Sequence, residues 1–460
     1  MAQLGARGEL RPARVERALQ PTRSSAPLTS SSSMRGSSAT AELSSEGCLH
    51  EYLELTEVSP LNTWTERDDG LATRFRPRET HPVLTSSGEV NLHWLRLRKL
   101  MGRVTVRHFM TLSALHYLAA GLLSVCLSLS VASAEVSPAN PQTNARAKAV
   151  LNYIAGLESR TEKRMLSGQF TDFGKNGTLT IIETIHEQSG HWPAIAGFDY
   201  VDFSTGGLTT KIPNQSAIAY WRSGGLITVG VHLYNPANPK GGGLRDNGVD
   251  LNDLLDSGTD THKRWMKQLD QLAEGLLELK EAGVVVIWRP FHEMNGDWFW
   301  WGAKRPADFV KVWQHMFDYF TKTKQLDNLL WSYGPNHRDN TADYYPGNEY
   351  VDLVGFDAYT DHVDPKHIKG YAALARIKKP FGFGEFGPHG AQKPPGDYDY
   401  RRFINGVVKH FPRSTYFMSW NAKWSLASNQ HVRELLGHPW IVNRDDVPAE
   451  LTGKADPKIP

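Results

Sequence analysis

Cysteine is nearly absent from this chain of 460 residues, which contains only Cys48 and Cys126. Both lie before residue 135, so the rest of the chain cannot form a disulfide. A chain without disulfides has to be held together by its hydrophobic core. The 326 residues that remain after the first 134 of 460 are enough for one domain to bury most of its surface.

The chain also has little net charge, with a formal value of +2. Without a strong electrostatic field, nothing in the charge indicates a nucleic acid or an anionic membrane as a partner. Aromatic residues make up 10% of the sequence and are concentrated after residue 190. A nearly neutral, aromatic-rich chain suits a neutral ligand with flat apolar faces, although aromatics also fill ordinary cores.

Several familiar catalytic motifs are missing. The segment HEMNG at 292–296 lacks the second histidine of the zinc motif HExxH, and neither GxSxG nor a Walker A sequence occurs. Metalloproteases, serine hydrolases and nucleotidases are therefore disfavoured. His232, His292 and Glu293 have no spacing that indicates a metal site, and we predict no metal in catalysis.

The first 134 residues divide into two segments. Residues 1–100 are rich in Ser, Arg, Thr and Pro without a sustained period, which predicts either disorder or an extension that is not part of the translated protein. Residues 101–134 carry two arginines, a long apolar run and the small-residue ending Ala132–Ala134, which are typical of a signal peptide cleaved before Glu135. A signal anchor is the alternative, because the apolar run is long enough to span a bilayer.

From residue 144 onward, short apolar runs alternate with amphipathic ones. Two helices are strongly patterned, at 261–283 and 305–326, and shorter ones are predicted at 368–378, 400–411 and 430–436. The apolar runs lack clean alternation, as expected for strands buried on both faces of a parallel sheet. They lie at 165–170, 193–200, 226–236, 284–295, 328–336, 350–360, 380–387 and 414–424.

Eight such strands with helices between them predict a (β/α)8 TIM barrel of class α/β, with residues 135–460 as a single catalytic domain. A doubly wound open sheet is disfavoured because no glycine-rich dinucleotide turn follows the first strand.

Polar residues gather at the ends of the predicted strands, where a barrel of this kind builds its active site. The fourth strand ends with Arg289, His292, Glu293 and Asn295, and the seventh carries Glu385. The third, sixth and eighth strands supply His232, Asn235, Asp357, Tyr359, Asp361, Trp420 and Trp424.

Two carboxylic acids on the fourth and seventh strands, facing each other across the mouth of one barrel, suit glycoside hydrolysis. One carboxyl group protonates the leaving oxygen, and the other attacks the anomeric carbon or activates water. The acid has to keep its proton near neutral pH, which requires a raised pKa. Glu293 lies among aromatic residues that provide apolar surroundings, and the glycines beside Glu385 are expected to let a substrate approach the backbone. Each glutamate taken alone is more often a solvated or ion-paired residue.

The motif WRPFHEMNGDWFWWG, followed 92 residues after Glu293 by GEFG, resembles glycoside hydrolase family 26. The resemblance covers about 144–440 and implies a (β/α)8 barrel, retention of configuration and no cofactor. It implies that Glu293 is the acid/base and Glu385 the nucleophile. His292 would help to hold the sugar, Trp298 would lie on the leaving-group side, and Tyr359 would donate to the nucleophile.

Three further substrate-binding residues are expected with less support. His232 lies in HLYNP, which matches the family's third-strand motif only in part because Val231 stands where the family often has tryptophan. Trp420 is similar to the aromatic platform beneath the sugar, with Trp424 as a competitor. Asn295 is expected to bind sugar hydroxyls. Phe299, Trp300 and Trp301 are interpreted as packing.

The sequence therefore predicts a secreted, retaining endo-β-1,4-mannanase whose partner is a mannan-type polysaccharide, acting as a monomer without nucleic acid or an obligate protein partner. A β-1,3-1,4-glucanase or a β-1,3-xylanase of the same family is the alternative. A non-catalytic carbohydrate-binding barrel is disfavoured because both glutamates are present, and a membrane-tethered barrel would have to retain residues 101–134.

Overall fold

The computed structural model describes residues 136–389 and 396–454. The predicted extension (1–100) and the predicted signal peptide (101–134) lie outside these residues. Within the described ranges, no helix combines the length and the apolar character needed to cross a membrane.

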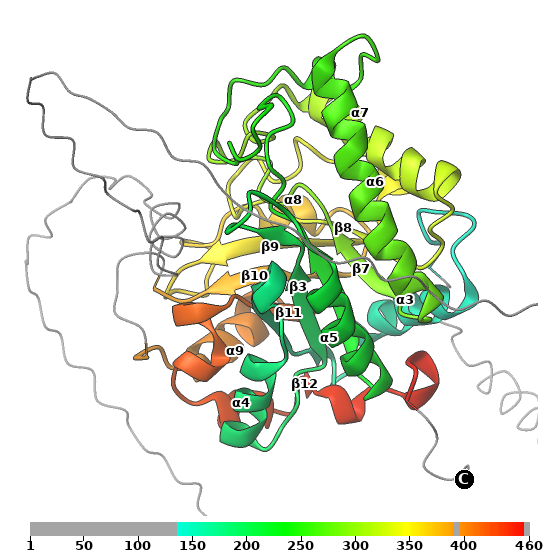
Figure 1. The fold of residues 1–460 in the computed structure, drawn as a ribbon. Coiled ribbons are helices and arrows are strands. Elements are labelled where there is room, and N and C mark those ends of the chain that lie inside the picture. The colour runs from blue at the N-terminus through cyan, green and yellow to red at the C-terminus, as the bar shows by residue number, and fades with distance from the viewer. Residues whose placement is uncertain (1–135, 390–395, 455–460) are drawn as a thin grey trace, which may run out of the picture. The chain divides into compact units, whose positions relative to one another are not determined.

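Eight parallel strands close into a barrel, as predicted (Figure 1). Each strand pairs with the next along the chain, and the last pairs with both the seventh and the first, which closes the ring. The strands are β2 (Gly168–Phe173), β3 (Ile195–Asp199), β6 (Leu226–Gly230), β7 (Val286–Arg289), β8 (Leu329–Tyr333), β9 (Leu353–Tyr359), β10 (Phe381–Gly387) and β11 (Ser414–Ser419).

Short additional strands surround this ring. The first predicted run is split into β1 (Met165–Leu166) and β2, and β1 pairs with β12 (Ile441–Val442). The interruption is Ser167, whose hydroxyl donates to the carbonyl of Val442 at 3.1 Å. A small antiparallel pair, β4 (Val201–Asp202) and β5 (Gly207–Leu208), follows β3.

The barrel strands are apolar because both of their faces are covered. Every residue of β3, β6, β7, β8 and β11 is buried. The inner faces pack against each other and the outer faces pack against helices, so the alternation of a half-exposed strand is missing.

Helices connect most of the strands and lie outside the ring (Figure 1). The two strongly patterned helices are confirmed as α6 (Asp260–Glu281) and α7 (Pro306–Asp318). Thr259 caps α6 by accepting the amide of His262 at 2.9 Å, and Pro306 occupies the first turn of α7. The others are α3 (Ala145–Leu157), α4 (Thr180–Ser189), α5 (Lys211–Arg222), α8 (Tyr371–Leu374), α9 (Tyr400–His410) and α10 (Val432–Leu436).

One predicted helix and two predicted strands differ from the observed elements in their bounds. The predicted helix at 368–378 shrinks to the four residues of α8, and β8 is joined to β9 through a 3-10 turn at Asn348–Tyr350. The third and fourth predicted strands were too long, because β6 ends at Gly230 and β7 at Arg289. Pro290 has no amide hydrogen to continue the ladder.

Directly after Pro290, the backbone takes left-handed conformations at Phe291 (φ 50°) and Glu293 (φ 55°). Such conformations are unfavourable for residues with a β-carbon and persist only where the surroundings enforce them. His292, Glu293 and Asn295 are therefore on a loop at the carboxyl end of β7, whereas Tyr359 and Glu385 are within β9 and β10.

Candidate active site

Glu293 is held by two hydrogen bonds from neighbouring loops. The indole nitrogen of Trp298 donates to its Oε2 at 2.7 Å, and the amide of Asn336 donates to its Oε1 at 2.9 Å. Its backbone amide also donates to the carbonyl of Gly334 at 2.7 Å, which helps to fix the left-handed turn. Both carboxylate oxygens therefore have defined positions.

Burial and, to a smaller extent, the charge of Glu385 raise the pKa of Glu293, and the net value is about 7. The hydrogen bonds from Asn336 and Trp298 and the charge of Arg289 act in the opposite direction. A carboxyl group with this pKa is both an adequate acid and an adequate base near neutral pH. The interaction with Glu385 also indicates that the two glutamates share one site.

Glu385 is almost completely buried in β10 and is bonded through both oxygens. Nη1 of Arg289 donates to Oε1 at 2.9 Å, and the hydroxyl of Tyr359 donates to Oε2 at 2.6 Å. The contact with Tyr359 matches the one implied by the family resemblance. The ion pair and the hydrogen bond from the hydroxyl orient this carboxylate, and both come from side chains of other strands.

Arg289 joins two buried carboxylates from different strands. Its Nη2 donates to Asp357 of β9 while its Nη1 donates to Glu385 of β10. Burial alone would lower the pKa of the guanidinium, but the charges of Asp357 and Glu385 raise it above its ordinary value. Arg289 thus remains a cation at the base of the site.

Gly384 provides the space for this arrangement. A β-carbon at that position would lie 2.8 Å from Oδ1 of Asp357 and 3.2 Å from Nε of Arg289. At Gly387, a β-carbon would meet the ring of Tyr359 at 2.3 Å. We predicted that these glycines let a substrate approach the backbone, and that interpretation is wrong because side chains of the chain itself occupy the space.

His232 and His292 form a buried chain with Asp199. Nδ1 of His232 lies 2.7 Å from Oδ2 of Asp199, and its Nε2 lies 3.0 Å from Nε2 of His292. Burial, with the neighbouring His232 and Arg289, holds the pKa of His292 well below its usual range, so this ring is neutral. Its Nδ1 is buried and has no hydrogen-bond partner among the described residues.

Asn295 is occupied by protein partners rather than facing a ligand. Its amide nitrogen donates to the carbonyl of Asn336 at 2.9 Å and to Oδ1 of Asn340 at 3.0 Å. Its Oδ1 accepts the backbone amide of Asn336 at 2.8 Å. These bonds differ from the sugar contact that we expected, and they place Asn295 in a role of positioning Asn336 against Glu293.

The aromatic tail of the motif divides as the sequence indicated. Trp298 is half-buried, and the guanidinium of the exposed Arg338 lies 4.8 Å from the centre of its ring. Phe299, Trp300 and Trp301 are buried in the core. The indole of Trp301 donates to the carbonyl of His292 at 2.8 Å, which links the packing residues to the loop that carries Glu293.

Trp420 and Trp424 are both close to the site but deeply buried. Trp420 is 1% exposed and packs 4.7 Å from Phe170 and 5.9 Å from His232, centroid to centroid. Trp424 is equally buried and lies 5.5 Å from Tyr359. Neither indole ring exposes a large face to solvent. A sugar that stacks on Trp420 would therefore contact only a small part of its ring.

The sequence analysis missed two residues that contact the predicted set. Asp199 at the end of β3 holds His232, and Asn336 after β8 holds Glu293. Both lie at the ends of predicted strands, 193–200 and 328–336, so position at a strand end was the available signal. It was too weak, because single Asp and Asn residues commonly follow strands as turn formers.

A buried pair of glutamates with different environments, set at the carboxyl end of a (β/α)8 barrel, defines the class of glycoside hydrolases. The model of glycosyl hydrolase family 26 matches residues 139–446, and the chain belongs to this family. The family resemblance inferred from the motif is therefore confirmed.

Relatives of known type agree with this assignment. The chain is 37% identical over 350 residues to a mannan endo-1,4-beta-mannosidase of Bacillus subtilis, covering 71% of this chain and 96% of the relative. The solved structure of a Bacillus subtilis mannanase is 36% identical, covers 67% of this chain and 95% of its own, and superposes with a TM-score of 0.64. A family 26 protein of Muricauda sp. is 29% identical, covers 67% of this chain and 99% of its own, and gives 0.56.

Proposed function

We propose that this chain is a secreted, retaining endo-β-1,4-mannanase that acts on mannan-type polysaccharides as a single chain. The observation that carries the proposal is the contrast between two neighbouring glutamates. The pKa of Glu293 is raised to about 7, mainly by burial, whereas Glu385 is bonded to the guanidinium of Arg289. The similarity to mannan endo-1,4-beta-mannosidases supports mannan as the substrate.

In the first step, Glu385 attacks the anomeric carbon while Glu293 protonates the leaving oxygen. The product is a covalent glycosyl-enzyme and a shortened chain. In the second step, Glu293 removes a proton from water, which attacks the same carbon and releases Glu385. Two inversions give net retention, for which the two carboxyl groups should be roughly 5–5.5 Å apart.

The surrounding residues have supporting roles in this proposal. Tyr359 and Arg289 orient Glu385 for attack, and Trp298 and Asn336 orient Glu293. His292 remains the residue expected to help hold the sugar, with His232 and Asp199 fixing its ring.

Substrate class is tested by incubating the protein with mannan, lichenan and β-1,3-xylan and measuring new reducing ends. We expect activity on mannan to exceed activity on the other two. Activity on lichenan without activity on mannan would replace the proposal with a mixed-linkage glucanase, and activity on β-1,3-xylan alone would indicate a xylanase.

The nucleophile is tested by Glu385→Ala. This variant should lose turnover, and azide should partly restore it with a product of inverted configuration, because the small anion enters the space left by the carboxylate. Glu349→Ala is a matched control, since Glu349 lies on the 3-10 turn before β9 and should be dispensable. Full activity of Glu385→Ala would rule out its role.

Secretion rests on the sequence of residues 101–134 alone. We expect the N-terminus of the protein recovered from a culture medium to be Glu135. Recovery of a membrane-bound form that retains residues 101–134 would instead support a signal anchor.

A further inference from the structure

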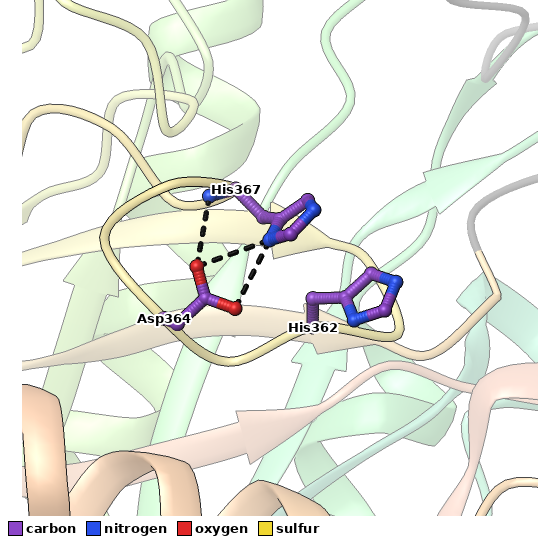
Figure 2. Close-up of side chains that lie close together, drawn as sticks. All are labelled: His362, Asp364 and His367. Carbon is purple, nitrogen blue, oxygen red and sulfur yellow. Dashed lines mark hydrogen bonds and ion pairs between the residues drawn. The ribbon is translucent and has the colours of Figure 1, made fainter. Parts of the chain in front are cut away.

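The loop that follows β9 contains a cluster of potential metal ligands that the proposed reaction does not use. His362, Asp364 and His367 lie within six consecutive residues. One ring nitrogen from each histidine and one carboxylate oxygen lie within 4.8 Å of one another. Figure 2 shows the two imidazoles and the carboxylate gathered on this one loop.

Asp364 is already fixed in position by its own loop. Its Oδ1 accepts the backbone amides of Lys366 at 2.8 Å and His367 at 3.2 Å. Both of its carboxylate oxygens lie 3.0 Å from Nδ1 of His367.

Two buried apolar side chains hold this loop against the hydrophobic core. Val363, between His362 and Asp364, and Ile368, directly after His367, are 7% and 1% exposed. The three candidate ligands are thus presented by a loop whose backbone is held by the core.

The candidate ligands themselves remain accessible to solvent. The side chains of His367 and Asp364 are 36% and 33% exposed, and His362 is exposed. The two imidazole rings are stacked with centroids 4.2 Å apart. Ligands of a tetrahedral site with bonds of about 2.1 Å lie roughly 3.4 Å from one another, so rotation of the exposed His362 side chain is enough to close the site.

The donor set selects the kind of cation. Two imidazole nitrogens and one carboxylate oxygen suit zinc and neighbouring transition metals, whereas calcium and magnesium prefer sites made only of oxygen. Three protein ligands leave a fourth position for water. The three ligands lie at positions i, i+2 and i+5 of one short segment. Closing the site therefore orders only a few residues and costs little chain entropy.

We propose that His362, Asp364 and His367 bind one divalent transition-metal ion of the zinc class at the rim of the barrel. The ion binds outside the catalytic pair and braces the loop that leaves β9 just after Tyr359. That loop is tied to β10 by the bond from the amide of Thr360 to the carbonyl of Gly387 at 2.9 Å. Bound metal should therefore stabilise the fold without taking part in glycoside cleavage.

The test is a calorimetric titration of the full chain with zinc chloride in a chelator-free buffer. We expect one ion per chain to bind, and His362→Ala and His367→Ala to weaken that binding by at least the roughly 10–100-fold that loss of a supporting second-shell partner costs. His431→Ala is the matched control, because His431 pairs with Glu434 at 2.9 Å on the surface without a second histidine. Its affinity should equal that of the parent.

Two further measurements separate binding from misfolding. Zinc should raise the unfolding temperature of the parent and of His431→Ala but not of His362→Ala, since an ion that binds only the folded state stabilises it by mass action. Cobalt should give the visible absorption of a nitrogen–oxygen tetrahedral site in the parent and in His431→Ala, but not in His362→Ala. Unchanged zinc affinity in both loop variants, or no binding by the parent, would overturn the proposal.

Discussion

At the scale of single residues, the main feature of the site is how Glu293 keeps its proton. Burial and the charge of Glu385 raise its pKa, while the donors Asn336 and Trp298 lower it. The value of about 7 is the result of these opposed effects. Each donor is therefore a means of setting the pH range in which the enzyme works.

Replacing Trp298 by phenylalanine should move that range. The indole N–H stabilises the carboxylate of Glu293, so its loss should raise the pKa by roughly one unit. Because the proposed reaction requires the protonated acid, kcat/KM should fall as pH rises through this pKa, and the alkaline limb should shift to higher pH. The measurement is kcat/KM on mannan as a function of pH.

Trp440→Phe serves as the control for this prediction. Trp440 is half-buried like Trp298, but its indole ring stacks against Arg164 beside β1. Its replacement should leave the pH profile unchanged. An alkaline limb that stays in place in Trp298→Phe would show that the indole bond does not set the pKa of Glu293.

At the scale of elements, β10 has to pass close to the side chains of its neighbour. Gly384 leaves room for Asp357 of β9 and for the guanidinium of Arg289 from β7. Side chains from β7 and β9 thus pack against the backbone of β10 at a position where a β-carbon would be too close to them. This contact links the packing of the barrel to the orientation of Glu385.

Gly384→Ala should therefore destabilise the protein and reduce its activity. Relieving a β-carbon contact of 2.8 Å requires Asp357 or Arg289 to move, with an overpacking cost of about 1–3 kcal/mol. Arg289 would also release Glu385, so kcat should fall. Urea denaturation and steady-state kinetics measure the two effects.

Gly156→Ala is the matched substitution in a helix. Gly156 lies in α3, where a β-carbon would meet nothing within 4 Å, so alanine should stabilise the helix by up to about 1 kcal/mol. Its activity should not change. Equal stability and kinetics of Gly384→Ala and the parent would contradict the proposed crowding.

At the scale of the whole molecule, the barrel accounts for the match to the family. Residues 139–446, which the family model matches, include all eight barrel strands and both glutamates. The segment before α3 is also tied to this barrel, because the amide of Ala139 donates to the buried Asp352 at 2.6 Å.

A protein made of residues 135–460 should consequently fold and act like the full chain. We expect its unfolding temperature and its kcat/KM on mannan to match those of the full chain, because the strands, helices and site residues described above are all retained. Thermal unfolding and a reducing-end assay check this. A truncated chain that unfolds or loses activity would show that residues 1–134 contribute to the domain.

The sequence alone determined the architecture and the pair of glutamates. Eight apolar runs separated by helical patterns require strands covered on both faces, and a closed parallel barrel satisfies all of them. The motif around Glu293 and the later GEFG were distinctive because few sites need a histidine, a glutamate and an asparagine so close together after a strand. Local pattern carries this information, so no tertiary structure was needed to read it.

Only the tertiary structure decided how those residues interact. Periodicity did not show that β7 stops at Arg289, which is set by Pro290, or that Glu293 lies on a left-handed turn, which depends on the bond from its amide to Gly334 after β8. The pairing of Asn295 with Asn336 joins loops 41 residues apart, and the space beside Gly384 is filled from β7 and β9. Hydrogen bonds and close packing between distant segments have no signature in a single sequence, whereas burial of a strand does.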